Sequence, residues 1–166
     1  MFSLSPEELG ICTLAEAEFP LEPGTRLVDR ASYHANPRVQ ETIGNCVNQM
    51  GRDEIVEQRP SSWGSAVTVV AISASTPCFL SDYRSTTNKN MIKTSWPMPN
   101  LESHLDTVGG ARYITVCDVQ NAYHQVSVAA SEKDETAFVT KNGKWVFKLL
   151  PFGIAVHHSS SREYRH

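Results

Sequence analysis

The sequence predicts an α+β fold, with an antiparallel sheet and helices packed mainly on one of its faces. Three patterns support this class. Apolar residues recur at steps of three and four through residues 37–50, as in an amphipathic helix. Ala66–Ile72 is a β-branched, apolar run typical of a strand. An Asn142-Gly143 turn between Glu135–Thr140 and Lys144–Leu149 predicts a β-hairpin.

Two helices are expected in the first third of the chain. Ser5, followed by proline and glutamates, has the pattern of a capping box, which predicts a short helix that ends near Glu18. Prolines and a glycine then predict an extended connector. Asn36 precedes a proline and is expected to cap the helix over residues 37–50, with Gly51 at its end.

The middle of the chain is expected to alternate strands with irregular segments. Phe79–Tyr83 is the expected hairpin partner of Ala66–Ile72, across a turn rich in serine, threonine and proline. Residues 84–99 show no clear period and predict a long loop. Leucine and valine spacing then predicts a short helix over residues 101–108, stopped by Gly109-Gly110.

The last third should complete the sheet. Tyr113–Cys117 is strongly apolar and predicts a strand that presents Asp118 at its end. The hairpin around Asn142-Gly143 follows, and Pro151-Phe152-Gly153 should end its second strand. Residues 157–166 lack an apolar pattern and predict a loose tail.

Composition and charge restrict the class of protein. No apolar run approaches the ~18 residues that a membrane helix needs, and the acidic N-terminus does not resemble a signal peptide. We therefore expect an intracellular protein of the cytoplasm or nucleus, without a membrane partner. Residues 1–83 hold 5 Lys and Arg against 11 Asp and Glu, whereas residues 84–166 hold 10 against 7. The second half could thus present a local basic groove.

The sequence also contains a series of short motifs that secondary-structure propensity does not explain. In order and spacing they resemble the reverse transcriptase (RNA-directed DNA polymerase) of gypsy-type LTR retrotransposons, over roughly residues 19–154. The matching segments are Leu21–Gly24, Asn36-Pro37, Ser61–Ser65, Asp82–Arg84, Trp96–Pro99, Asp106–Ala111, Tyr113–Gln125, Thr136–Phe138 and Leu150–Gly153.

This resemblance implies a fold and an activity. It implies right-hand polymerase fingers and a partial palm over residues 36–154, after a lead-in over residues 1–35 and before a divergent tail over residues 155–166. The implied chemistry is nucleotidyl transfer assisted by two Mg²⁺ ions, with Mn²⁺ as a substitute. The implied partners are an RNA or DNA template-primer and a deoxynucleoside triphosphate.

The resemblance also assigns roles to particular residues. Asp118 matches the first metal-binding and catalytic aspartate, beside the backbone carbonyl of Val119; its alternative is an ordinary strand-end carboxylate. The residues implied for the nucleotide are Ala122, Tyr123, Phe152 and Gly153, and those implied for the template and fingers are Asp82, Arg84, Lys89 and Lys93. An ion pair between Asp82 and Arg84 would explain that motif nearly as well.

Three departures from the family motifs bear on activity. The chain contains no Asp-Asp pair, which the family uses to complete its metal site. The family's fingers lysines are missing from Ala71–Phe79, and Cys78 stands where arginine is expected. The family sequence does not continue beyond Ala155. We therefore expect a truncated, inactive polyprotein fragment whose exposed palm strand favours self-association.

Two other functions remain open. A non-catalytic nucleic-acid-binding remnant would use the basic second half and lose affinity as salt is added. A hydrolase built on Cys117, Asp118 and His124 is the weaker hypothesis. On a strand, Cys117 and Asp118 would point to opposite faces, which disfavours a joint nucleophile and base.

Overall fold

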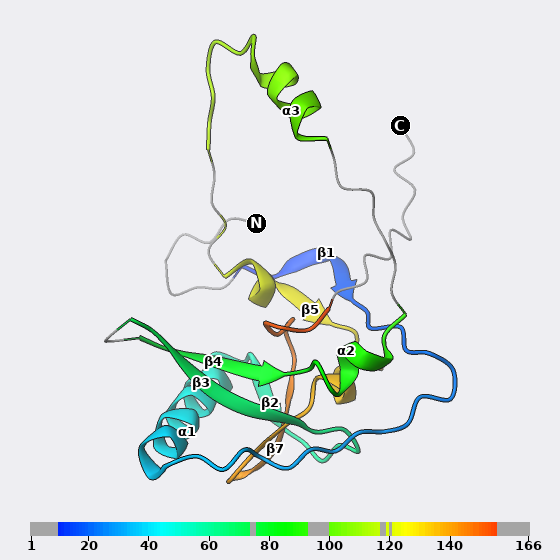
Figure 1. Cartoon of the computed structure of the whole chain (residues 1–166), viewed down its shortest axis with the longest axis vertical. Coiled ribbons are helices and arrows are strands. Elements are labelled where there is room, and N and C mark those ends of the chain that lie inside the picture. Colours follow the sequence, from blue (N-terminus) through cyan, green and yellow to red (C-terminus); the bar gives the residue numbers. More distant parts are fainter. Residues whose placement is uncertain (1–9, 74–75, 93–99, 117–118, 120, 156–166) are drawn as a thin grey trace.

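The computed structural model describes residues 10–73, 76–92, 100–116, 119 and 121–155 (Figure 1). This part of the chain has the predicted α+β fold, and most of its neighbouring strands are antiparallel. The predicted tail over residues 157–166 lies outside the described residues. Within those that are described, no helix has the length and apolar character to cross a membrane.

The main sheet contains five strands, and antiparallel pairing joins all neighbours except β6 and β3, which run parallel. The β3–β4 hairpin confirms the predicted Ala66–Ile72 strand and its partner, in the register Ala66 opposite Asp82. The β6–β7 hairpin confirms the second predicted turn, with Gly143 at a φ of 123°. In sheet order the strands are β2 (Val56–Gln58), β7 (Gly143–Phe147), β6 (Phe138–Thr140), β3 (Ser65–Ser73) and β4 (Thr76–Asp82).

Helix α1 (Pro37–Arg52) confirms the helix predicted over residues 37–50. The Asn36 side chain caps it by accepting a hydrogen bond from the backbone N–H of Val39 at 2.9 Å. The expected end at Gly51 is wrong by a short distance, because the helix includes Arg52 and is capped by Asp53.

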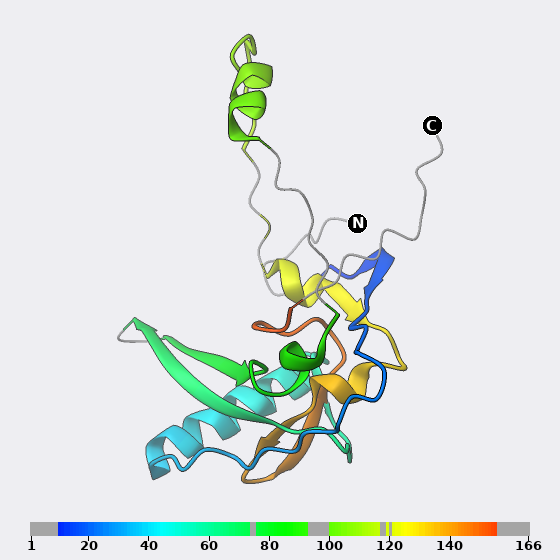
Figure 2. The ribbon, with the colours of Figure 1, turned by 45° about the vertical axis from the view of Figure 1, so that its right-hand side comes forward.

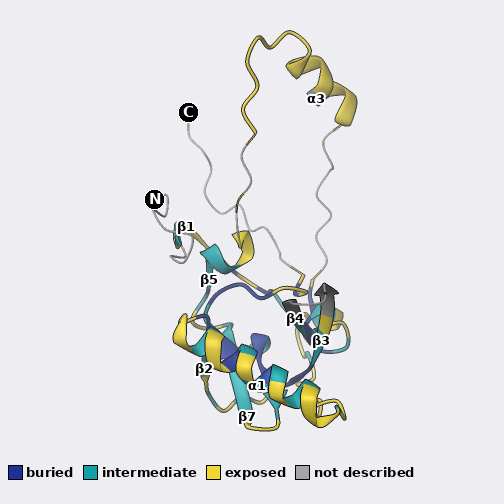
Figure 3. Ribbon diagram, turned by 90° about the vertical axis from the view of Figure 1, so that its left-hand side faces the viewer, coloured by how far each residue is buried: buried dark blue, intermediate teal, exposed yellow. Residues whose placement is uncertain are grey.

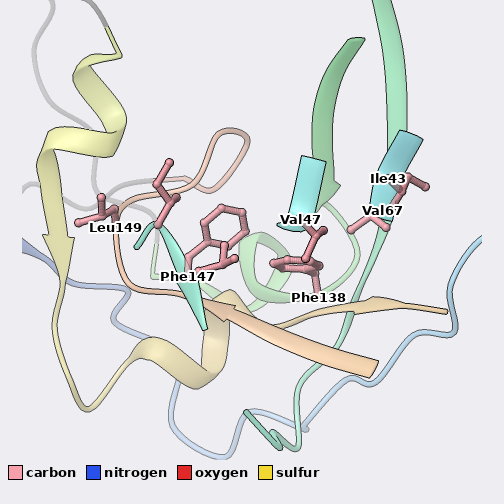
Figure 4. Close-up of a cluster of buried hydrophobic side chains, with 8 residues drawn as sticks. Ile43, Val47, Val67, Phe138, Phe147 and Leu149 are labelled. Carbon is pink, nitrogen blue, oxygen red and sulfur yellow. The ribbon is translucent and has the colours of Figure 1, made fainter. Parts of the chain in front are cut away.

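The main core lies between α1 and the sheet. Figure 3 shows buried residues on the side of α1 that faces the strands. Phe138 has no exposed surface, and its ring centroid lies 5.1 Å from that of Phe147 and 5.3 Å from that of Phe79. The cluster comprises Ile43, Val47, Ile55, Val56, Val67, Phe138, Phe147 and Leu149 (Figure 4).

A smaller layer forms from distant parts of the chain. Strand β1 (Cys12–Ala17) pairs in parallel with β5 (Val126–Val128). The helix predicted to end near Glu18 is therefore wrong for residues 12–17, because these residues pair with β5, and Ala17 and Phe19 are buried. The beginning of that predicted helix, with its capping residues, lies outside the described residues. A second buried cluster joins this layer to the rest of the chain: Ala17, Phe19, Tyr83, Met91, Val128, Leu150 and Ile154.

Short helical turns replace two predicted irregular or extended segments. Helix α2 (Thr87–Asn90) lies in the segment predicted as a loop. The 3₁₀ turn η2 (Lys133–Thr136) occupies the predicted beginning of the hairpin strand, so β6 begins only at Phe138. The Thr136 hydroxyl holds this turn, since it donates to the carbonyl of Lys133 and accepts from the backbone N–H of Phe147.

Residues 100–116 form an arm that projects from the rest of the structure (Figures 1 and 2). It contains the predicted helix, α3 (Leu101–Val108), whose leucine face is largely exposed. The strand predicted over Tyr113–Cys117 is wrong for residues 113–116, which lie outside any strand, with Tyr113 91% exposed and Val116 88% exposed. Because a strand needs a hydrogen-bonded neighbour, an apolar sequence alone does not make one. Cys117 and Asp118 lie outside the described residues.

Candidate functional site

Asp82 and Arg84 form an ion pair at the end of β4. The guanidinium donates from Nε to one carboxylate oxygen at 2.9 Å and from Nη2 to the other, also at 2.9 Å. This geometry confirms the ion pair considered for this motif. The Arg84 side chain is nevertheless 86% exposed, so its remaining donors face solvent.

The surroundings of Asp82 keep it ionised. The hydrogen bonds from the Arg84 side chain hold the pKa of Asp82 well below its usual range, and a hydrogen bond from the Tyr33 hydroxyl acts in the same direction. The Tyr33 hydroxyl donates to Asp82 at 3.0 Å, and this bond raises the pKa of Tyr33. At neutral pH the site therefore contains a carboxylate fixed between a guanidinium and a phenol.

A cavity of about 580 Å³ lies beside this ion pair. Its walls come from the connector before α1, from the β3–β4 hairpin, and from the turn after β7. Asp82, Arg84 and Gly153 all line it, although the first two were expected near the template and the third near the nucleotide. The structure thus brings residues of two separate predicted motifs to one cavity.

Tyr123 and Phe152 are in contact, although 29 positions of sequence separate them. Tyr123 lies in the 3₁₀ turn η1 (Ala122–Gln125), and its ring centroid is 5.1 Å from that of Phe152. His124 packs edge-on against the same Phe152 ring at 5.0 Å. Burial lowers the pKa of His124, so its imidazole is neutral at neutral pH and packs as an aromatic ring.

The turn that holds Phe152 is fixed by backbone geometry. Gly153 has a φ of 88°, which favours glycine, and a Cβ atom there would lie 3.3 Å from the backbone oxygen of Ser81. The Asn88 side chain hydrogen-bonds to the backbone directly after this glycine Cα: it donates to the Gly153 carbonyl and accepts from the Ala155 N–H. The turn therefore has one tightly specified position beside β4.

The other predicted site residues are not assembled in the described part of the chain. Lys89 lies on α2 and is exposed, Ala122 is the first residue of η1, and Val119 is exposed. Lys93 and the expected catalytic residue Asp118 lie outside the described residues. Among the residues that the structure describes, no group of three or more His, Cys, Asp and Glu side chains could hold a metal ion.

The sequence motifs missed two residues of this site. Tyr33 bonds to Asp82 from 49 positions away, and Asn88 bonds to Gly153 from 65 positions away. Both lie in segments without a distinctive local pattern. His124 was named only in the hydrolase hypothesis and within the Tyr113–Gln125 motif, and in the structure it contacts Phe152.

Comparisons with known proteins place this arrangement in context. No family model matches the chain. The Retrovirus-related Pol polyprotein from transposon 412 of Drosophila melanogaster is 26% identical over 94% of this chain and 13% of its own length. The corresponding polyprotein from transposon gypsy of the same fly is 28% identical over 92% of this chain and 15% of its own length. The chain thus spans less than a sixth of these relatives.

Solved structures with a similar fold are also reverse transcriptases. Native prototype foamy virus protease-reverse transcriptase matches with a TM-score of 0.71 and 18% identity, over 89% of this chain and 20% of that one. A foamy viral protease-reverse transcriptase in complex with RNA/DNA hybrid matches with a TM-score of 0.67 and 15% identity, over 90% and 20%. The chain is therefore similar to a segment of the retrovirus-related Pol polyproteins of transposons 412 and gypsy, and it has the fold of part of a reverse transcriptase.

Proposed function

We propose that this chain supplies the template-facing and nucleotide-facing surfaces of an RNA-directed DNA polymerase, with fingers and the beginning of a palm over residues 36–154. The convergence of two motifs on one cavity carries the proposal. The Asp82–Arg84 pair and the Phe152-Gly153 turn are far apart in sequence and adjacent in space. In this proposal residues 1–35 lead into the fingers and residues 155–166 are a divergent tail.

The chemistry of the cavity, and of the aromatic pair at the adjoining Phe152-Gly153 turn, suits a nucleic acid. An exposed guanidinium whose donors are only partly used by Asp82 can bind a phosphate oxygen. The exposed edges of Tyr123 and Phe152 offer an apolar surface for a sugar or base of an incoming nucleotide. Lys89 and Lys93 would add contacts to template phosphates. In two solved relatives the bound molecules are an RNA/DNA hybrid and double-stranded DNA, which agrees with such partners.

The chain supplies at most some of the carboxylates that a polymerase needs to bind its two Mg²⁺ ions. Two Mg²⁺ ions need several carboxylates close together, and the described residues provide no such cluster. Asp118, with the Val119 carbonyl beside it, would be one ligand, but the sequence has no Asp-Asp pair to complete the set. We therefore propose that this chain binds nucleic acid without catalysing synthesis by itself.

Arg84→Ala should weaken binding of an RNA template annealed to a DNA primer by roughly tenfold at low salt, because a charge-assisted hydrogen bond is lost. The slope of log affinity against log salt should fall by about one, as expected for one phosphate contact. Fluorescence anisotropy with a labelled duplex at several salt concentrations measures both quantities.

Arg59→Ala is the matched control. Arg59 is half-exposed and, like Arg84, is paired with an aspartate, Asp134 at 3.3 Å, but it does not line the cavity. Its loss should leave affinity within about twofold. Equal losses in both variants would show general charge attraction, and a salt-independent affinity would contradict phosphate contact altogether.

A non-catalytic nucleic-acid-binding role, independent of any polymerase, is the second candidate. The excess of 10 basic over 7 acidic residues after position 83 favours it. The two candidates differ in substrate preference. A polymerase segment should prefer a recessed primer end over blunt duplex, whereas a binder that only neutralises phosphates should bind both alike.

The projecting arm supports a further proposal, that two copies of the chain associate through it. Leu101, Leu105, Tyr113, Ile114 and Val116 are each more than 60% exposed on one short segment, a concentration typical of interaction surfaces rather than scattered apolar residues. A two-fold axis would let each arm cover the other. The expected contact is with the arm residues themselves, since residues 113–116 form no strand.

Sedimentation velocity over a range of concentrations should therefore show a dimer that forms as concentration rises. Replacing both Leu101 and Leu105 with glutamate should shift the chain to monomer, because two charges would be buried at the contact. Leu14→Glu, which alters an equally exposed leucine on β1, should leave the dimer intact. A wild-type chain that stays monomeric throughout would contradict the proposal.

A further inference from the structure

Asn88 joins two segments that the predicted motifs treat separately. Its Nδ2 donates to the backbone oxygen of Gly153 at 2.8 Å, and its Oδ1 accepts from the backbone N–H of Ala155 at 2.8 Å. One amide thus uses its donor and its acceptor on the two backbone groups that flank Ile154, at the C-terminal end of the turn after β7. We call this pair of hydrogen bonds the Asn88 clamp.

The clamp holds the turn that contains Phe152. Gly153 has a positive φ and already lies close to the Ser81 backbone, so the turn has little freedom to move toward β4. The clamp restrains it from the side of α2. Phe152 directly precedes this glycine and contacts Tyr123 and His124. The clamp and the Phe152 ring therefore belong to the same short turn.

Asn88 is itself held by a rigid base. Its backbone N–H donates to the carbonyl of Tyr83 at 3.0 Å, and Tyr83 is fully buried, with its hydroxyl donating to the carbonyl of Thr136 at 2.9 Å. The preceding threonines are also buried and bonded, Thr86 to the Ser65 hydroxyl and Thr87 to the carbonyl of Glu135, each at 2.6 Å. The side chain therefore projects from a fixed point on α2.

We propose that Asn88 is a positioning residue, whose clamp fixes the Phe152-Gly153 turn so that Phe152 and Tyr123 form one continuous aromatic surface. This inference rests on the proposed function only for its purpose, which is to shape the nucleotide-facing surface. The clamp itself is a property of the free chain. Asn88 touches the turn and is not assigned to the reacting atoms.

The clamp can be detected directly in the unmodified chain by NMR. A scalar coupling across the hydrogen bond between Asn88 Nδ2 and the Gly153 carbonyl is expected, together with a protected amide at Ala155 and a nuclear Overhauser effect between the Phe152 and Tyr123 rings. These measurements need no variant and no nucleic acid. Absence of the coupling from a folded chain would overturn the proposal.

Asn88→Ala should increase hydrogen exchange at the Ala155 amide about tenfold, the effect of losing one hydrogen bond, and should weaken the Phe152–Tyr123 contact. Asn90→Ala is the matched control, because Asn90 lies on the same helix and donates instead to the carbonyl of Thr86 at 2.9 Å. It should leave Ala155 and the ring contact unchanged. Exchange at Ala155 within twofold of wild type in Asn88→Ala would overturn the proposal.

Asn88→Asp separates the clamp from general stability. Above the ordinary carboxyl pKa of about 3.9, the ionised group can still accept from Ala155 but faces the Gly153 carbonyl without a proton to donate. As pH falls through the pKa of that group, the neutral acid regains a donor, so the ring contact should recover relative to the wild-type contact at the same pH. Protonation of His124, which touches the same Phe152 ring, is common to both chains and cancels in this comparison. A ring contact in Asn88→Asp that does not depend on pH would overturn the proposal.

Nucleic-acid binding is measured separately from these NMR experiments. A failure to bind nucleic acid would refute the proposed function, but it would not bear on whether the Asn88 clamp exists.

Discussion

Phe138→Ala should lower the free energy of unfolding by about 3–5 kcal/mol, the range for removing a fully buried aromatic side chain. Phe138 has no exposed surface and contacts the rings of both Phe79 and Phe147. It lies on the central strand β6, between the sheet and α1, so its loss opens a cavity that neighbours cannot fill (Figure 4). Because domains of this size are stable by about 5–15 kcal/mol, urea denaturation should show a much lower midpoint.

A matched leucine pair tests whether burial causes this effect. Leu149 belongs to the same core and is 6% exposed, whereas Leu14 on β1 is 77% exposed. Leu149→Ala should cost about 2–5 kcal/mol and Leu14→Ala less than about 0.5 kcal/mol. Similar values for both leucines, or a Phe138→Ala midpoint equal to wild type, would contradict the described core.

Local signals predicted the elements that depend mainly on neighbouring residues. The cap at Asn36 and the apolar period after it predict α1, since both act within a few residues. The Asn142-Gly143 turn predicts the β6–β7 hairpin for the same reason. These predictions are confirmed because no distant partner competes with the local preference.

Elements that depend on distant partners were predicted wrongly. The first strand, β1, pairs with residues more than 100 positions away, in the register Cys12 opposite Val126, and nothing local indicates that pairing. The opposite error occurred at Tyr113–Val116, where an apolar, β-branched sequence predicted a strand that has no neighbour in the described part of the chain. In both cases a strand is decided by its partner rather than by its own residues.

In the candidate site, too, local motifs indicated individual residues, whereas distant contacts decide how those residues are arranged. Asp82, Arg84, Tyr123, Phe152 and Gly153 were named from short motifs, and their roles remain predictions. The placement of Asp82, Arg84 and Gly153 around one cavity, and the contact of Tyr123 with Phe152, depend on tertiary contacts that the motifs do not contain. Tyr33 and Asn88, which hold this assembly by hydrogen bonds, had no local signal because their partners lie 49 and 65 positions away in the sequence.

Primer extension tests the central claim most directly, namely that this chain carries nucleic-acid-facing surfaces of a reverse transcriptase without a complete set of catalytic carboxylates. Labelled DNA primer on an RNA template is incubated with all four deoxynucleoside triphosphates and Mg²⁺ or Mn²⁺. The same preparation is first shown to bind the duplex, so that absence of product reflects chemistry rather than a misfolded sample.

The expected result is binding with no extended product from the wild-type chain, indistinguishable from Asp118→Ala. The reason is the absence of an Asp-Asp pair from the sequence, since two cations cannot be held in catalytic geometry by one carboxylate. Template-dependent incorporation by the wild-type chain that disappears in Asp118→Ala would contradict the claim and show a working polymerase site.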